Sequence, residues 1–314
     1  MRGRTIYELG YTNMNDLITK TQKGYSLVDS GDQEKLERFG DLLVIRPETQ
    51  ALWPKKNGDI WTKAGAIFSK DGWSLSKSVP NNLPFEINKI KTQLVLGKGR
   101  NIGVFPEYAG EWEIFQKLLA IKNSQKSSSI TGPWPRVLNL FAYTGVSSTA
   151  CALAGAEVVH VDSSRTSNET AKKTAEENGV DKKIRFITED SLSFAKREVR
   201  RGNKYDLIVL DPPVFGRGPK GQVFKLEDQI LPIVNELKQL LTDDALGIFL
   251  NGYASEYSPE SYRNILETAT GMETIAGNLS IEEEGGRLKL TVGKWAFAFK
   301  NEEIKGIILG QIKS

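Results

Sequence analysis

The sequence predicts an α/β protein in which a smaller β-rich domain precedes a doubly wound, largely parallel sheet. Two patterns support this fold class. From residue 136 onward, apolar runs of strand length alternate with segments of helical periodicity, and before residue 108 short β segments are separated by Gly, Asn, Asp and Pro. With 314 residues, 39% of them hydrophobic and 26% charged, the chain has the length and composition of a globular protein with a large core.

The N-terminal residues 1–108 are expected to form the β-rich domain, with strand signals at 41–46, 59–69 and 84–96. Its tryptophans, Trp53, Trp61 and Trp73, fit the core of a small β domain, and the alternative is that they stack on bases. Residues 109–135 follow as a helix over 109–122 and a polar linker over 124–135.

Residues 136–300 carry the alternating pattern of the doubly wound domain. Strands are expected near 136–141, 157–161, 184–188, 205–210, 245–251, 272–279 and 290–299, and helices near 146–154, 164–178, 191–201, 226–241 and 259–269. The last two strands, joined across 282–287, predict an antiparallel hairpin at the sheet edge, and 301–314 is expected to be a C-terminal tail.

Composition argues against several classes of protein. There is no run of about 18 apolar residues and no apolar segment behind the basic N-terminus, so neither a membrane span nor a signal peptide is expected. One cysteine and one histidine allow no intrachain disulfide, disfavour a Cys/His metal site and fit a reducing cytoplasm.

The charge is unevenly distributed. Residues 1–135 hold 19 Lys and Arg against 14 Asp and Glu, whereas 136–314 hold 23 against 25. A basic accessory domain beside a near-neutral one favours a polyanionic partner such as RNA, and the alternative is a solvated lysine surface.

The most informative segment is 205–218. Its apolar run reads as a buried parallel strand, which the prolines of Asp211-Pro212-Pro213 terminate. An acidic side chain and donor-free carbonyls are thereby expected at the carboxyl edge of the sheet, where open α/β sheets bind ligands. They can accept hydrogen bonds from a flat nitrogenous substrate, on which Phe215 could stack.

The segment 137–145 predicts a strand that runs into a tight turn and a helix, and 157–162 predicts a second strand ending in Asp162. Such an acid hydrogen-bonds ribose hydroxyls. A dinucleotide would need the G-x-G-x-x-G pattern, but Gly145 stands alone, which favours S-adenosylmethionine over a dinucleotide. Asp190, after the third strand, is expected to accept from the adenine amino group, although both aspartates could instead be helix caps. His160 is expected to be structural.

Together these residues resemble the class I methyltransferases that modify large-subunit ribosomal RNA in bacteria, including a 5-methylcytosine and a 7-methylguanine enzyme. The resemblance rests on Asn139-x-Phe141-x-Tyr143-Thr144-Gly145, on Asp211-Pro212-Pro213-x-Phe215 and on Gly103-Val104-Phe105-Pro106-Glu107. It implies a Rossmann-like, seven-stranded catalytic domain and an RNA-contacting N-terminal domain. The cofactor contacts that follow are Phe105, Asn139, Phe141, Tyr143, Thr144, Gly145, Asp162, Ser163, Asp190, Ser191 and Asp211.

One departure from the family bears on the chemistry. Methylation of pyrimidine C5 requires a thiolate that adds to C6, and the family's cytosine enzyme carries that cysteine just past the strand matching 245–251. Here Leu250 to Ser255 contain none, and Cys151 is expected to be a small core residue. A nitrogen acceptor needs no such nucleophile.

The resulting hypothesis is in-line methyl transfer to a nucleobase nitrogen of ribosomal RNA, with guanine as the expected base. Asp211, Pro212, Pro213 and Phe215 would hold the base, and Arg217 and Lys220 would contact phosphates from a loop at 216–221. The alternatives are a protein side-chain amide or a small molecule as acceptor, an ordinary surface loop at 216–221, and a non-catalytic RNA-binding assembly factor.

Overall fold

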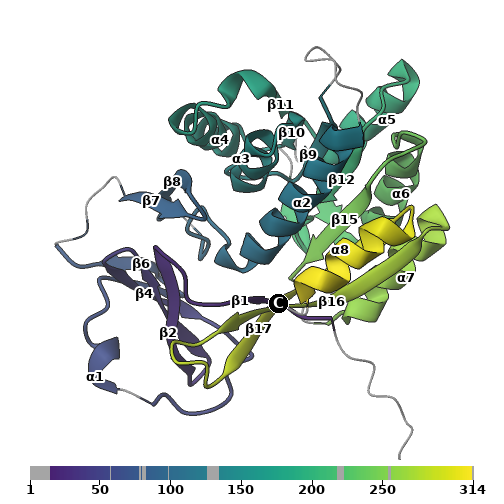
Figure 1. Cartoon of the computed structure of the whole chain (residues 1–314). Helices are drawn as coiled ribbons and strands as arrows, with labels where there is room; N and C mark the ends of the chain where they lie inside the picture. Colours follow the sequence, from purple (N-terminus) through teal and green to yellow (C-terminus); the bar gives the residue numbers. More distant parts are fainter. Residues whose placement is uncertain are drawn as a thin grey trace, which may run out of the picture.

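An eight-stranded sheet forms the centre of the C-terminal part of the chain (Figure 1). The computed structural model describes residues 15–56, 58–77, 79, 83–97, 99–125, 134–217, 223–253 and 256–312. Across the sheet the strands lie in the order β1 (Leu17–Thr19), β16 (Glu273–Glu282), β17 (Lys289–Phe299), β15 (Gly247–Gly252), β12 (Leu207–Leu210), β9 (Arg136–Leu140), β10 (Glu157–Asp162) and β11 (Ile184–Thr188). Only β17 runs antiparallel to its neighbours.

Strand β9 is the topological switch point of the sheet. The chain passes from β9 to β10 on one side and later returns to β12 on the other, with all three strands parallel. Loops leaving the carboxyl ends of such strands diverge and open a crevice, which is where α/β sheets bind ligands. The expected α/β fold class is confirmed, and the strands predicted between 136 and 299 all form.

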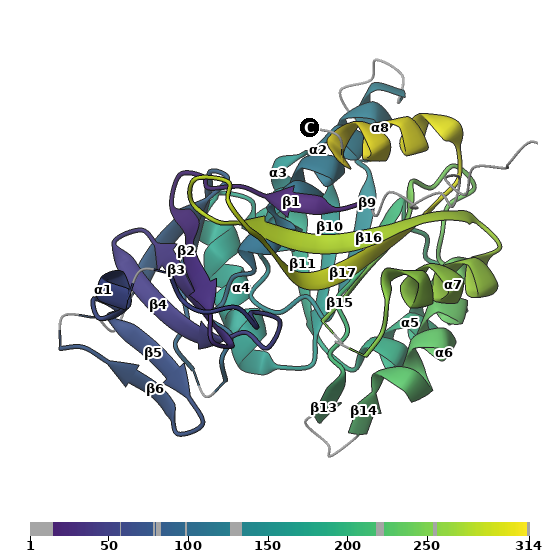
Figure 2. The ribbon, with the colours of Figure 1, turned by 90° about the horizontal axis from the view of Figure 1, so that it is seen from below.

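Helices cover both faces of the sheet (Figures 1 and 2). One face carries α2 (Ala109–Gln125), α3 (Val146–Leu153), α4 (Arg165–Glu177) and α8 (Glu302–Ile312), and the other carries α5 (Ser191–Arg201), α6 (Leu226–Gln239) and α7 (Pro259–Thr270). The buried strands pack against both helix layers, because successive residues such as Val137 and Leu138 point to opposite faces of the sheet.

The N-terminal part forms a five-stranded sheet and a separate hairpin. The sheet contains β2 (Tyr25–Gly31), β3 (Glu34–Phe39), β4 (Leu42–Pro47), β5 (Ala66–Ser69) and β6 (Gly72–Leu75), and the hairpin contains β7 (Leu83–Ile87) and β8 (Ile90–Leu94). Trp61 is 6% exposed and donates to Asp29 at 2.7 Å, while Trp53 donates to the carbonyl of Ser30 at 2.9 Å. These two indole N–H groups are therefore committed to protein acceptors.

The tip of the β16–β17 hairpin ties the two parts together (Figure 2). Residue Glu283 forms a parallel bridge with Leu27 of β2 and accepts from the hydroxyl of Ser30 at 2.6 Å and from Lys56 at 2.9 Å. Because Glu283 is only 4% exposed, these contacts are shielded from water and fix the N-terminal sheet against the eight-stranded one.

The structure differs from the sequence-based expectation at a few elements. The sheet has eight strands rather than seven, because β1, which is too short to show a period, pairs with β16 and occupies the edge expected for the hairpin. The segment 59–69 begins inside the one-turn helix α1 (Gly58–Trp61) before β5, and 84–96 is the β7–β8 hairpin. The expected tail contains α8, whose Ile304 and Ile308 are buried.

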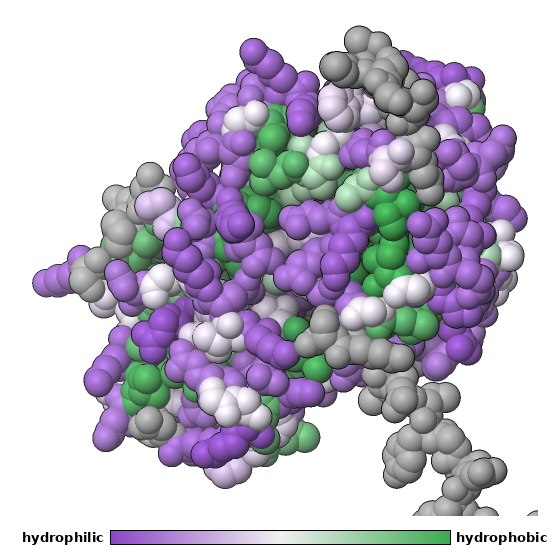
Figure 3. Space-filling model, in the orientation of Figure 1, coloured by the Kyte–Doolittle hydropathy of each residue, from purple (hydrophilic) through white to green (hydrophobic). Residues whose placement is uncertain are grey.

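Hydrophilic side chains cover most of the face shown in Figure 3. Among the described residues no helix combines the length and the apolar character that a membrane crossing requires.

Candidate active site

A cavity of about 600 Å³ lies at the carboxyl ends of β9, β10 and β12, facing the N-terminal sheet. The catalytic sheet contributes Phe141, Tyr143, Asp162, Ser163, Ser164, Ser167, Asp211, Pro213, Tyr253 and Val292, and the N-terminal part contributes Lys35, Arg46, Pro47, Glu48, Gly99, Arg100, Asn101, Phe105 and Glu107. An adjoining inner pocket shares Phe105, Phe141, Tyr143 and Asp211 with it and reaches Asn139, Thr144, Gly145 and Asn251. Small-molecule sites commonly have the volume of the larger cavity, whereas the inner pocket has a volume of only about 30 Å³.

The turn after β9 has an unusual backbone. Phe141 and Tyr143 are non-glycine residues with φ of 55° and 49°, and Gly145 follows with φ of 79°. Left-handed conformations at bulky residues are strained and persist only where surrounding contacts hold them. Here the amide of Tyr143 donates to Asp162 Oδ2 at 2.8 Å, and the Thr144 hydroxyl donates to the carbonyl of Gly103.

Gly145 lines the inner pocket, but a second constraint also requires glycine there. A Cβ at this position would lie 2.7 Å from the Cβ of Ala171 in α4 and 3.4 Å from the His160 ring. Helix packing and the positive φ therefore require glycine at this position independently of any ligand.

Asp162 ends β10 and faces the cavity, as the sequence predicted. Its Oδ2 accepts from the Tyr143 amide and its Oδ1 from the Ser164 amide, both at 2.8 Å. Burial raises the pKa of Asp162, and these two hydrogen bonds oppose the rise. The hydroxyl of Ser164, not the carboxylate of Asp162, caps α4. A carboxylate has about four acceptor sites, so two remain for ligand hydroxyls.

Asn139 and His160 belong to a buried polar chain behind the turn. Asn139 donates to Ser148 Oγ at 2.9 Å, and Ser148 Oγ lies 2.9 Å from His160 Nδ1. Burial lowers the pKa of His160 to about 3, so the ring is neutral at physiological pH. These contacts give His160 a structural role, in line with the sequence-based expectation.

Asp190 and Ser191 lie outside both cavities. Asp190 Oδ1 accepts from the Ser193 amide at 2.9 Å and thereby caps α5, and Ser191 is 3% exposed. The helix-cap alternative therefore describes the contact that Asp190 makes in this structure, and an adenine contact from this residue stays a prediction.

Asp211 lies where β12 ends, between the cavity and the inner pocket. Burial raises its pKa from 3.8 to about 7; the neighbouring Glu107 adds to the rise, while the Tyr108 hydroxyl opposes it. A carboxyl group with a pKa near neutrality can exchange a proton at physiological pH, which suits general acid–base work. Pro212 is buried and Pro213 lines the cavity.

The predicted substrate-contacting residues beyond Pro213 lie farther out. Phe215 is 54% exposed and does not line the cavity. It lies on β13 (Phe215–Arg217), which pairs with β14 (Val223–Lys225). Arg217 is described here only by its backbone in β13, and Lys220 lies outside the described residues. The structure thus places a hairpin, rather than only a loop, beside the site.

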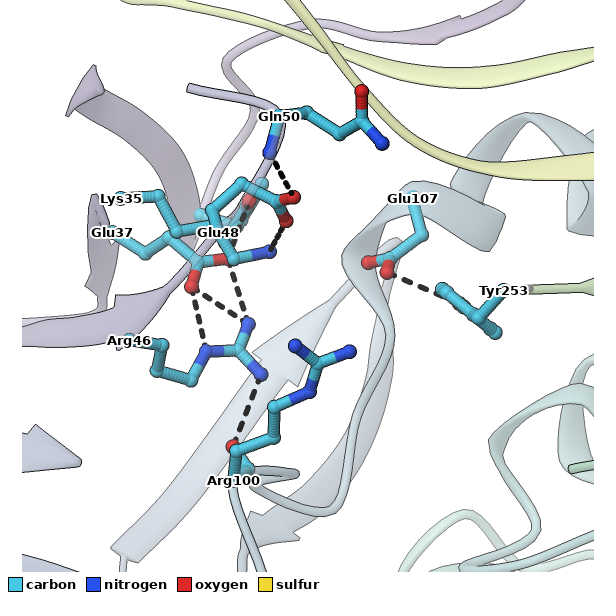
Figure 4. A network of polar contacts seen from close by, with 9 residues as sticks. Lys35, Glu37, Arg46, Glu48, Gln50, Arg100, Glu107 and Tyr253 are labelled. Carbon is cyan, nitrogen blue, oxygen red and sulfur yellow. Dashed lines mark hydrogen bonds and ion pairs between the residues drawn. The ribbon is translucent and has the colours of Figure 1, made fainter. Parts of the chain in front are cut away.

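The wall from the N-terminal sheet is a network of ion pairs (Figure 4). Arg46 on β4 makes two hydrogen bonds to Glu37 on β3, at 2.7 and 2.8 Å, and Lys35 lies 3.6 Å from Glu37 and 3.8 Å from Glu48. Arg46 also donates to the carbonyl of Arg100 at 3.4 Å. Desolvation favours the neutral form of Glu37, but Arg46 and Lys35 keep its pKa below the usual value.

Two buried acidic residues, Glu107 and Glu111, were not among the site residues predicted from the sequence. Glu107 Oε1 accepts from the Tyr253 hydroxyl at 3.1 Å, and Glu111 Oε2 accepts from Asn251 at 2.9 Å. Burial raises the pKa of both carboxyl groups. The rings of Tyr108 and Tyr253 pack on Phe105 with centroids 5.5 Å away, so this acidic group lies under an aromatic cluster.

The sequence held only a weak signal for these residues. Glu107 stood inside the Gly103–Glu107 segment and Tyr253 directly followed the Asn251-Gly252 end of β15, but neither position carried a role of its own. Lys35, Arg46 and Arg100 reach the cavity only through the packing of two sheets, which no local pattern reports.

Cys151 lies inside α3 and is 1% exposed. Burial raises the pKa of its thiol to about 12, so the reactive thiolate is scarce. The described residues contain no group of three or more His, Cys, Asp and Glu side chains that could hold a metal ion.

The residues that line the cavity and the inner pocket fit S-adenosylmethionine. Asp162 has free acceptor capacity for ribose hydroxyls, the aromatic residues Phe105, Phe141 and Tyr143 offer apolar surface, and the lone Gly145 gives no cradle of amides for a pyrophosphate.

Comparison with known proteins agrees with this fit. Residues 85–274, more than half of the chain, match the family described as S-adenosylmethionine-dependent methyltransferase. A crystal structure of a SAM-dependent methyltransferase from Agrobacterium tumefaciens is 34% identical and covers 91% of this chain and 93% of its own, with a TM-score of 0.84.

Two curated relatives match shorter stretches. Ribosomal RNA large subunit methyltransferase K of Neisseria meningitidis is 30% identical over 137 residues, which are 43% of this chain and 39% of the relative. Ribosomal RNA large subunit methyltransferase I of Escherichia coli is 26% identical over 206 residues, or 57% and 48%. The chain spans less than half the length of either relative. The family match and the shared fold together show that this chain belongs to the class I S-adenosylmethionine-dependent methyltransferases.

Proposed function

We propose that this chain methylates a nitrogen of a guanine base in large-subunit ribosomal RNA. The observation that carries the proposal is the position of Asp211, a carboxyl group with a pKa near 7 that lies between the inner pocket and the open cavity. The names of the two curated relatives support an RNA substrate, and the basic N-terminal part supports a polyanionic one.

The proposed cofactor contacts follow the inner pocket. Asp162 would accept from ribose hydroxyls, while Phe105, Phe141 and Tyr143 would pack on the cofactor, and Asn139, Thr144 and Gly145 would shape the pocket behind them. Ser163 lines the cavity beside Asp162. When bound, S-adenosylmethionine supplies a methyl group on a positively charged sulfur.

The chain's own contribution to the reaction is positioning and proton acceptance. Asp211 and the carbonyl of Pro212 would accept hydrogen bonds from the base and hold its nitrogen in line with the methyl group, and orientation of this kind can lower a barrier by roughly 7–11 kcal/mol. The nitrogen–methyl bond would form as the sulfur–methyl bond breaks, with the bonding pair left on sulfur. Asp211 would take the proton that an exocyclic amine releases.

The residues around Asp211 favour a nitrogen acceptor over a pyrimidine carbon. A C5 transfer needs a thiolate near the base, but Asn251 and Tyr253 occupy the end of β15, and Cys151 is buried in α3 with a pKa of about 12.

The outer surface would hold the RNA. Phe215, which is more than half exposed and lies outside the cavity lining, would stack on the base or its neighbour, and Arg217 and Lys220 would reach phosphates. Residues 1–108 would form the RNA-contacting domain, joined through 109–135 to the methyltransferase domain of 136–300 and the tail of 301–314. A base in a duplex would have to be flipped out to reach the cavity.

Mass-spectrometric nucleoside analysis of ribosomal RNA from cells with and without the gene tests the proposal. We expect one methylated guanosine to disappear with the gene and to return with the wild-type copy but not with Asp211→Asn. Loss of 5-methylcytidine would contradict the nitrogen chemistry. An unchanged nucleoside profile would turn attention to a protein amide or a small molecule as the acceptor, or to a non-catalytic assembly role.

A further inference from the structure

Glu107 lines the cavity and has one buried carboxylate oxygen without a partner among the described residues. The residue is 3% exposed, lies in the short helix η1 (Pro106–Tyr108) and lines the cavity beside Tyr253, on the side away from Lys35 and Arg46 (Figure 4). Its Oε1 accepts from the Tyr253 hydroxyl at 3.1 Å, whereas Oε2 has no hydrogen-bond partner among the described residues. Buried polar atoms nearly always have a hydrogen-bond partner, so a donor group on a ligand is the expected partner of this oxygen.

The inner pocket has an unpaired acceptor of its own. Asn251 lines the inner pocket with an amide oxygen that no described residue pairs, and its nitrogen is held by Glu111 at 2.9 Å. Glu107 does not line that inner pocket and instead faces the outer cavity together with Asp211 and Pro213. Its donor is therefore more readily a group of the substrate than one of the cofactor.

The surrounding charges can keep Glu107 able to accept. Burial raises the pKa of Glu107 and Glu37 adds to the rise, while Lys35, a hydrogen bond from the residue's own amide and Arg46 oppose it without cancelling it. The Tyr253 hydroxyl donates to the charged form, and the Tyr253 ring is fixed against Phe105 and Tyr108 at centroid distances of 5.5 and 6.0 Å. Tyr253 is thus a positioning residue, because it fixes the carboxylate so that Oε2 points away from its own contact.

We infer that Glu107 is a specificity-determining residue that accepts the ring N1–H of a guanine base while Asp211 accepts from the adjacent exocyclic amino group. This inference rests on the proposed function and extends it from the reaction to the choice of base. Guanine presents two neighbouring donors on one edge, which two carboxylates can hold together. Adenine and cytosine place an acceptor nitrogen beside their amino group, and uracil has one N–H between two carbonyls, so each would face a carboxylate with an oxygen or a lone pair.

The test uses the purified full chain, labelled S-adenosylmethionine and ribosomal RNA extracted from cells that lack the gene. Glu107→Gln keeps the shape of the side chain but replaces one acceptor with a donor. We expect it to lower kcat/KM for RNA by about 10- to 100-fold, the usual value of one good base contact, with the cofactor Kd from calorimetry unchanged. Tyr253→Phe should give a smaller loss of the same kind, and it keeps the test open if Glu107→Gln does not fold.

Glu113→Gln is the matched control. Glu113 lies on α2 and loses the same charge in this variant, but it is exposed, contacts Gln311 and does not line the cavity. Its kcat/KM for RNA should equal that of the wild type.

Each other outcome contradicts a defined part of the account. If Glu107→Gln behaves like Glu113→Gln, the residue does not select the base. If it weakens cofactor binding and leaves the KM for RNA unchanged, Glu107 is a cofactor ligand. If the wild type methylates a base other than guanine, this inference fails while ribosomal RNA methylation stands. If no label enters RNA, both the inference and the proposed function fail.

Discussion

The two walls of the cavity differ in what occupies their charged groups. On the sheet side, Asp162 is held by backbone amides from residues within 20 positions of it, and Asp211 keeps its carboxyl group at the cavity. On the N-terminal side, Lys35, Glu37 and Arg46 are occupied by one another. The sheet side therefore offers acceptors to a ligand, whereas the ion pairs of the N-terminal side maintain the shape of the opposite wall.

The largest effect should come from Asp211, which separates a ligand-facing acid from a structural one. Asp211→Asn removes the proton acceptor, and we expect kcat/KM for RNA to fall by about 10²- to 10⁴-fold in methyl-transfer assays. In the wild type the active form is the carboxylate, so kcat/KM should rise with pH and level off above about 7. A pH profile that is flat through neutrality would show that this carboxyl group does not act in the reaction.

Arg46 tests whether the opposite wall depends on its ion pairs. Arg46→Met leaves Glu37 buried with one fewer partner, which should lower the free energy of unfolding by about 3–5 kcal/mol in denaturant titrations. The double variant with Glu37→Met should recover most of the loss. Lys23→Met is the control, because Lys23 is 94% exposed and its pair with Glu86 should contribute little. Equal effects of Arg46→Met and Lys23→Met would contradict the contrast between the walls.

Asp211→Asn should raise the free energy of unfolding, although it lowers activity. Its folded-state pKa is raised from 3.8 to about 7, so the folded protein holds a proton that the unfolded chain releases. The contribution of Asp211 to stability is therefore complete below about pH 3.8 and is lost as the pH rises to about 7. Above that pH, Asp211→Asn should be more stable than the wild type by roughly 2–4 kcal/mol, with no difference in acid. Urea titrations at both pH values measure this, and a variant destabilised in the alkaline range would argue against the burial penalty.

The sequence predicts the acidic residues of the sheet-side wall but not the ion pairs of the opposite wall. Asp162 and Asp211 could be assigned because each directly follows an apolar strand, and the carboxyl ends of parallel strands meet at one edge. The Lys35–Glu37–Arg46 network could not be assigned, because it depends on the register of β3 with β4, and the acceptor role proposed for Glu107 could not, because it depends on tertiary packing. The three-residue strand β1 and helix α8 were missed for a related reason, since tertiary packing defines them more than any local period does.

Variants of Asp162 test the proposed cofactor contact, with a smaller expected effect. Asp162→Ala should weaken S-adenosylmethionine binding by about 1–3 kcal/mol in calorimetry, the cost of one or two buried hydrogen bonds. The same variant also frees the amides of Tyr143 and Ser164, so Asp162→Asn, which retains an acceptor, should lose less. Unchanged affinity in both variants would place the cofactor elsewhere.

The smallest effect is expected at Arg100, which is exposed at the cavity rim. If it contacts an RNA phosphate, Arg100→Ala should lower the slope of log K against log salt by about 0.7–0.9 in binding titrations, with kcat nearly unchanged. An unaltered slope would leave the N-terminal wall as a shaped surface without a phosphate contact from this residue.

The most direct test of the central claim is the transfer of labelled methyl groups from S-adenosylmethionine to ribosomal RNA from gene-deleted cells, followed by nucleoside analysis. The account predicts label in one guanosine derivative with the wild-type chain, and a loss of rate with Asp211→Asn while the cofactor still binds. Label in a cytidine carbon, or equal rates for the two proteins, would contradict it.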